Sequence, residues 1–367
     1  MAKVKQKTQV LVSKSLFPSE PLSLDGTVKS KHSPHFQGRV MAAARRQLDR
    51  FAALESKVLR GDNPKAIHDI RVASRRLQQI LDLLYPPPPS QKIRKLRRAI
   101  RRCRKVLSVV RNYDVLLVRA ERTLRRRRIS RREAWEAIRD YLKDQRERSY
   151  RKASRRLSKL HLPTIYVRLR ENLGSLRGSE VRFEPSRVPG PALRSDPNAA
   201  LHDKIENQLQ ETWSSLAGEV RKAQEDRDTP ALHAVRIAAK KTRYLIEVIH
   251  LLDTPGSSQA LSCLRRVQRH LGDWHDLEIL EETMLEMVAS SGILEEQLEL
   301  AMDVQKLVLQ NRKRKKAYEK RFFEMAESSG EWDRLGNWVQ AYITNDSSRS
   351  LRSAAGGHSA GFPPSTT

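Results

Sequence analysis

The chain has 367 residues, and its 71 lysines and arginines outnumber 43 aspartates and glutamates to give a formal net charge of +28. A surface with so much positive charge repels itself, and an anionic partner usually offsets that repulsion; nucleic acid, polyphosphate and an anionic membrane surface all fit. Only 5% of the residues are aromatic, which argues mildly against a single-strand nucleic-acid binder built on stacking platforms.

Breaks in hydrophobic periodicity divide the chain into two helical stretches. Residues 1–34 mix Ser, Pro, Lys and Gly and predict a flexible segment. The first helical stretch, 35–176, is broken at 61–64, at the prolines 86–89 and near Pro163, and a linker rich in Gly, Pro and Ser follows over 177–197. The second stretch, 198–330, is broken near Pro230, Gly256 and 290–292. We expect a terminal helix over 331–344 and a disordered tail over 345–367.

The helix predicted after Pro64 separates apolar from basic side chains. At about 100° per residue, one face collects Ile67, Ile70, Ala73, Leu77, Ile80, Leu81 and Leu84. The opposite face carries a row of polar residues, namely His68, Arg71, Arg75, Gln78 and Asp82. Such a row spans roughly 15 Å and suits an extended ligand of repeating negative charge.

The next predicted helix, 91–111, is also basic on one side. Its apolar stripe consists of Ile93, Leu96, Ile100, Cys103 and Leu107. The residues that point away from this stripe are Arg94, Arg98, Arg101, Arg102 and Lys105. The two helices side by side would form a wall of guanidinium groups that match phosphate oxygens.

The second stretch repeats the first. Residues 67–77 parallel 232–242, and 107–116 match 271–280 without a gap. The repeated helix buries Val235, Ala238, Thr242, Leu245, Ile246 and Ile249, and we expect it to expose His233, Arg236, Lys240, Arg243 and Glu247. A thinner second row consists of Arg265, Arg266 and Arg269. The prediction is an all-α protein of two pseudo-symmetric antiparallel bundles that form a basic central groove or pore.

Structural interpretations of the same residues remain open. Solvated helix faces are often basic, but they usually mix in acids for i,i+4 pairs, and these rows hold few. The histidines fit a structural role almost as well, and Asp114 and Glu278 are expected to pair with basic residues. The arginine run 125–128 and the basic run 312–316 are more typical of plain surface.

Catalytic signatures are weak throughout. No Gly-rich phosphate loop, HExxH or supported Ser/His/Asp arrangement occurs, and the doublets His68-Asp69 and His275-Asp276 are too short to indicate a metal site. We expect no catalytic residue, no metal and no cofactor, and therefore a binding protein rather than an enzyme.

Compartment signals point to the cytoplasm. Cys103 and Cys263 lie far apart in helical patterns without a CxxC pair, which favours buried thiols in a reducing environment. No apolar run approaches the ~20 residues of a membrane span, and the N-terminus lacks the pattern of a secretory signal.

The paired motifs resemble the CHAD domain, the "conserved histidine α-helical domain". The resemblance is carried by His68-x-x-Arg71-Val72-x-x-Arg75-Arg76-Leu77 and by His233-x-x-Arg236-Ile237-x-x-Lys240-Lys241-x-Arg243. It covers about residues 35–330 and implies two helical bundles around a basic channel, binding of inorganic polyphosphate, and in several members a location at polyphosphate granules. The phosphate-contacting set that it implies is His68, Arg71, Arg75, Arg76, His233, Arg236, Lys240, Lys241 and Arg243.

Departures from the family pattern occur in the first half. Gln78 stands where another basic residue is usual, and Ser108 and Asn112 replace Gly and Asp. We expect helix 91–111 to compensate for weaker binding along the first motif helix. A nucleic-acid-binding protein, a polyphosphate phosphohydrolase and a granule scaffold remain as alternatives.

Overall fold

The computed structural model describes residues 36–85, 88–175, 197–290, 297–328 and 330–355. Within these ranges the regular structure is entirely α-helical, which confirms the all-α part of the predicted fold class. The segment 1–34, nearly all of the linker 177–197, and residues 356–367 of the tail lie outside them. The helices are α1 (Phe36–Ala53), α2 (Glu55–Arg60), α3 (Pro64–Leu84), α4 (Gln91–Val106), α5 (Ser108–Leu124), α6 (Arg132–Ser158), α7 (Leu162–Ser175), α8 (Pro197–Asp226), α9 (Thr229–His250), α10 (Ser257–Ser290), α12 (Leu298–Ser328) and α13 (Gly330–Ala355).

The two motif helices, α3 and α9, begin in the same way. The side chain of Asn63 accepts a hydrogen bond from the backbone N–H of Ala66 at 2.9 Å, and Asp228 accepts one from Ala231 at 2.8 Å. A proline follows each cap within the first turn, where its missing N–H has no helical partner to lose. The same chemistry therefore fixes where both motifs start.

The predicted apolar faces of α3, α4 and α9 are buried as expected, and so are Cys103 and Cys263. The predicted helix 91–111 is interrupted at Leu107, where α4 ends and α5 begins. The matching segment of the second half lies within one continuous helix, α10. At the C-terminus, α13 continues to Ala355, past the expected helix end at residue 344.

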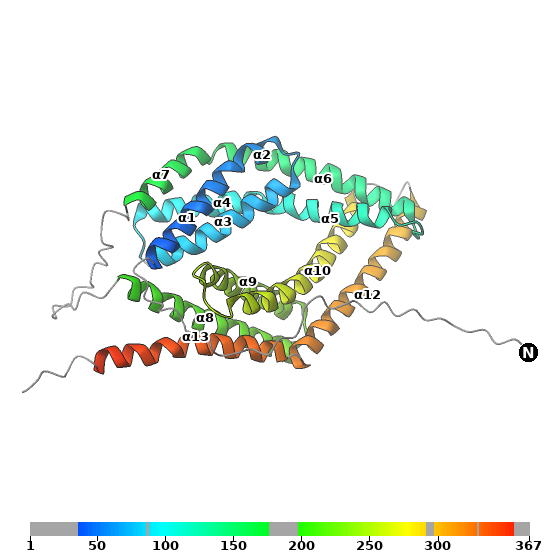
Figure 1. Ribbon diagram of the computed structural model, residues 1–367. Coiled ribbons are helices and arrows are strands. Elements are labelled where there is room, and N and C mark those ends of the chain that lie inside the picture. Colours follow the sequence, from blue (N-terminus) through cyan, green and yellow to red (C-terminus); the bar gives the residue numbers. More distant parts are fainter. Residues whose placement is uncertain (1–35, 86–87, 176–196, 291–296, 329, 356–367) are drawn as a thin grey trace, which may run out of the picture. The chain divides into compact units, whose positions relative to one another are not determined.

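Two hydrophobic clusters hold the helices together, and each draws on both sequence halves. The larger contains side chains of α1, α3, α4 and α7 together with those of α8, α9 and α13. The smaller lies where the hairpin of α5 and α6 packs against the hairpin of α10 and α12 (Figure 1). Because the cores are shared, α3 and α9 are held against each other. No described helix is long and apolar enough to cross a membrane.

Candidate anion-binding site

A cavity of about 390 Å³ lies where α3, α4, α8 and α9 meet. Each motif helix contributes basic side chains to its wall, and α4 and α8 close its sides. The lining residues are Arg75, Gln78, Gln79, Asp82, Arg104, Gln208, Thr212, Ile237, Lys240, Lys241 and Tyr244. Arg75 and Lys240 occupy equivalent positions in the two motifs. Each half therefore contributes the same motif position to the wall of one cavity.

The first half supplies several arginines that are close enough to repel one another. A guanidinium nitrogen of Arg71 donates to the backbone oxygen of Arg104, and Arg104 donates to Gln78 Oε1 at 2.9 Å. Burial, and then the charges of Arg75 and its neighbours, lower the pKa of Arg71 to about 10 and also lower that of Arg104. Uncharged acceptors hold these two arginines, so their charge is not neutralised.

The second half places Lys240 opposite this group. Burial lowers its pKa first, and the charges of Arg236, Arg75, Arg71 and Arg243 lower it further, to about 7. The Nε atoms of Arg236 and Arg243 are buried and, among the described residues, have no hydrogen-bond partner. Positive charge and unused donors therefore accumulate at the junction of the two halves.

One predicted position on α9 is wrong. Glu247, expected to be exposed, is buried, because α3 lies across that part of α9. Its carboxylate is 2.8 Å from Arg76 Nε and 3.6 Å from an Arg243 amino group. Arg76 and Arg243, both in the predicted phosphate-binding set, thus share one carboxylate that ties the two halves together.

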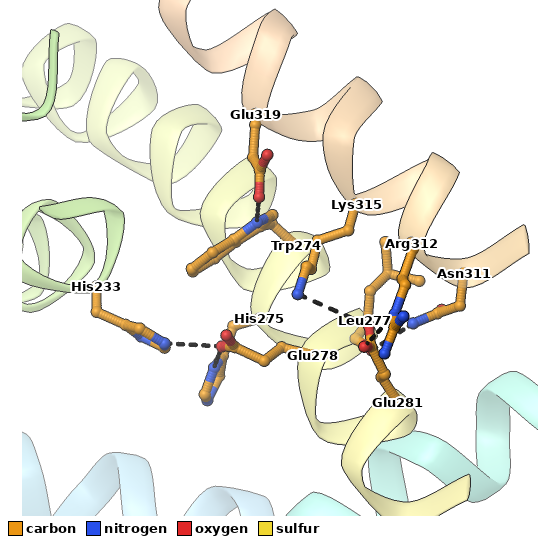
Figure 2. A network of polar contacts seen from close by, with 10 residues as sticks. All are labelled: His233, Trp274, His275, Leu277, Glu278, Glu281, Asn311, Arg312, Lys315 and Glu319. Carbon is orange, nitrogen blue, oxygen red and sulfur yellow. Dashed lines mark hydrogen bonds and ion pairs between the residues drawn. The ribbon is translucent and has the colours of Figure 1, made fainter. Parts of the chain in front are cut away.

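The two motif histidines have different surroundings. His68 is exposed in part, and partial desolvation of its ring, followed by the charge of Arg111, lowers its pKa. His233 is half-buried at the edge of the Trp274 ring, with Nε2 2.7 Å from Glu278, which His275 also approaches at 3.4 Å. Figure 2 shows both rings directed at this carboxylate. The expected pairing of Glu278 is confirmed, with histidine as its partner.

His233, His275 and Glu278 place three ligand atoms within 4.8 Å of one another. Burial and then the charge of Arg236 lower the pKa of His275 to about 4, so its ring is neutral near pH 7. The charge of Arg236 acts against a cation at this position, whereas a neutral imidazole ring is the form that binds metal. Asp276 lies in the same field, and burial raises the pKa of its carboxyl group.

The outward rows of α4 and α10 lie apart from the cavity lining. Arg94, Arg98, Arg101, Arg102 and Lys105 of α4 are exposed, as predicted. Arg265, Arg266 and Arg269 of α10 are exposed too, and Arg266 is 2.7 Å from Glu331 of α13. The first row offers open cationic surface beside the cavity helix α3, whereas the second is partly neutralised.

Eight lining residues were not in the predicted phosphate-binding set, namely Gln78, Gln79, Asp82, Arg104, Gln208, Thr212, Ile237 and Tyr244. Arg104 follows the outward row of α4 by position, but it turns toward α3. Tyr244 projects from α9 between Arg75, which donates to its hydroxyl, and Arg243. For these additional lining residues, the sequence offered one usable signal, the run of basic residues around Arg104, which indicates an anion-binding surface.

Comparison with known proteins was made at the levels of family, sequence and structure. The sequence model of the CHAD domain family matches residues 42–285. The structure is similar to the crystal structure of the CHAD domain from the plant Ricinus communis, with a TM-score of 0.57 and 22% identity over 80% of this chain and 92% of that one. It is also similar to PptA from Streptomyces chartreusis, with a TM-score of 0.50 and 14% identity over 80% and 99% of the two chains. No curated protein sequence matches the chain.

Proposed function

The chain belongs to the CHAD domain family, and from that premise we propose that it binds inorganic polyphosphate in the cavity between α3 and α9 without performing chemistry on it. Members of this family are associated with polyphosphate. The contacts would be charge-assisted hydrogen bonds from Arg75, Arg104, Lys240 and Lys241, which line the cavity. We further propose that the protein acts at polyphosphate granules.

One observation carries this proposal: the cavity wall concentrates cations without a matching number of carboxylates. After burial, the charges that lower the pKa of Lys240 most belong to Arg236, Arg75, Arg71 and Arg243, all of the same sign. Like charges held at a half-buried site destabilise the free protein, and a polyanion in the cavity relieves that repulsion. A site of this kind gains most from a ligand with several adjacent negative charges.

The cavity favours polyphosphate over single-stranded nucleic acid. Base stacking requires a free aromatic face, and Tyr244 is the aromatic residue of the lining. The guanidinium carbons of Arg75 and Arg243 lie 4.9 and 4.8 Å from its ring centre. Because these two guanidinium groups already pack against the Tyr244 ring, the cavity offers contacts for phosphate but no free aromatic face for a nucleic-acid base.

The lining also favours binding over hydrolysis. Its carboxylate, Asp82, forms an ion pair with Arg97 and is thereby engaged. The remaining lining residues are basic, amide, hydroxyl or apolar groups, which hold a phosphate chain but do not activate water by themselves.

A binding titration tests the proposal. The double substitution Arg104→Gln with Lys240→Gln should weaken polyphosphate binding at least about tenfold, because it removes two charge-assisted contacts. The matched control is Arg155→Gln with Arg156→Gln, which removes equal charge from an exposed part of α6. Equal weakening in the two variants would contradict the cavity as the site.

Displacement of polyphosphate by RNA of equal phosphate concentration at ~150 mM salt would favour the nucleic-acid alternative.

A second assay addresses catalysis directly. The purified protein is incubated with polyphosphate, with and without Mg²⁺ or Mn²⁺, and released phosphate is measured. We expect no release above the rate without protein. Release that disappears in a His233→Gln or Glu278→Gln variant would instead assign phosphohydrolase activity to the cluster in Figure 2.

A further inference from the structure

An apolar groove of about 410 Å³ lies between α10 and α12, and it shares no lining residue with the anion-binding cavity. Four large hydrophobic side chains around it are exposed to an unusual degree: Leu285 by 48%, Leu298 by 62%, Met302 by 49% and Leu309 by 50%. Single exposed hydrophobic residues are common, but a contiguous group marks an interaction surface.

The exposed residues of α12 have the spacing of a helix-pairing seam. Leu298, Met302, Gln305 and Leu309 follow one another at intervals of four, three and four. The inner side of α12 already packs into the smaller core through Val304, Leu307 and Val308, so the exposed seam is additional to what the fold requires. A second seam at heptad spacing fits another helix.

The seam is complementary to itself when reversed. With the twofold axis between positions 305 and 306, Met302 of one copy stands opposite Leu309 of the other. In this antiparallel register the exposed Glu299 of one copy approaches the exposed Lys313 of the other, and twofold symmetry forms that pair twice. Lys306 would approach its own symmetry mate, and Asp303, 3.1 Å from its amino group, offsets that charge.

We propose that α12 pairs with α12 of a second copy of this chain, antiparallel and around a twofold axis near Gln305. Leu285 of α10 borders the seam and widens the apolar contact. The seam from Leu298 to Leu309 is about 17 Å long, so the interface is at the small end of specific contacts and a weak dimer is expected. This inference does not depend on polyphosphate and leaves the cavity unobstructed.

Cysteine crosslinking tests the register. In a Gln305→Cys variant, the two cysteines beside the twofold axis should form an intermolecular disulfide under mild oxidation, while the native Cys103 and Cys263 are buried. The matched control is Gln310→Cys, an exposed position on the same helix but about 140° around it. A covalent dimer in the first variant and monomer in the second is the expected result. Equal crosslinking of both variants, or of neither, overturns the register.

Mass measurement tests the surface independently. Light scattering without polyanion should show dimer increasing over roughly the micromolar range, and Met302→Lys with Leu309→Lys should abolish it. Because both side chains are exposed, the variant should keep its helical circular dichroism and its polyphosphate affinity, which separates this outcome from a failure of the proposed function. A wild-type chain that stays monomeric at every concentration overturns the proposal.

Discussion

At the scale of residues, Lys240 is the most informative side chain of the site. Its pKa, lowered to about 7 by burial and by neighbouring arginines, leaves it partly deprotonated near neutral pH. Arg75 occupies the equivalent position in the first motif and remains charged, because a guanidinium group does not lose its proton in this range. The two halves therefore present one fixed and one titratable cation to the same cavity.

Polyphosphate binding is predicted to take up a proton. A polyanion beside Lys240 favours the charged form and raises its pKa, so affinity should increase as the pH falls toward about 7 and level off below it. Calorimetry at pH 7.5 in buffers of different ionisation enthalpy measures the number of protons bound. Lys240→Arg should keep the affinity and lose the uptake attributable to this residue. Equal proton uptake in wild type and Lys240→Arg would show that another group, such as His68, is responsible.

The same lysine is predicted to destabilise the fold. Its pKa is about 7 in the folded protein and near 10.5 when unfolded, so the unfolded chain binds more protons between these values. The free energy of unfolding should therefore rise with pH across this window. Lys240→Met should raise stability at pH 7 by about 0.5–2 kcal/mol and flatten that rise, while weakening polyphosphate binding. Denaturant melts at pH 7 and pH 9 measure both effects; a destabilised variant would show that Lys240 serves packing.

At the scale of elements, the pair α3 and α9 is joined by a carboxylate between two arginines. Glu247 is buried on α9, where Arg243 approaches it from one turn earlier on the same helix and Arg76 reaches it from α3. This arrangement holds the two basic faces near each other despite their repulsion. Removing one member of such a group leaves the others buried without compensation.

Glu247→Gln is accordingly predicted to lower the free energy of unfolding by about 3 kcal/mol. The matched control is Glu147→Gln on α6, whose ion pair with Arg151 is exposed and should change stability by less than about 0.5 kcal/mol. Urea denaturation followed by circular dichroism measures both variants. Similar small losses in the two would contradict the linking role of Glu247.

Hydrophobic periodicity was sufficient to predict the helices and their buried faces, because burial alternates within each helix on a local scale. It placed Ile67, Leu77 and Ile246 in the core correctly. It could not show which polar residues meet across halves, since that depends on how α3 packs on α9. Glu247 was misplaced and Arg104 was missed for this reason. The two hydrophobic cores that the sequence halves share could not be predicted either, because periodicity does not reveal which helix packs against a given apolar face.

At the scale of the whole molecule, the net charge is +28, and the basic side chains differ in whether an acidic side chain pairs with them. Many exposed arginines on α6 pair with acids along the same helix, as Arg148 does with Asp144 and Arg151 with Glu147. The outer face of α4 is different, with the exposed row Arg94, Arg98, Arg101, Arg102 and Lys105. A polyphosphate chain long enough to leave the cavity would meet this row next.

The salt dependence of binding should therefore increase with chain length. Each phosphate contact releases counterions, so a short chain held by four lining cations should show a log–log slope of about −3, and a long chain a steeper one. Replacing the five α4 residues by Gln should return the long-chain slope to the short-chain value and leave short-chain affinity within about threefold. Fluorescence anisotropy from ~50 to ~300 mM salt measures these slopes. Identical slopes for short and long chains in the wild type would confine binding to the cavity and leave the α4 row without a part in it.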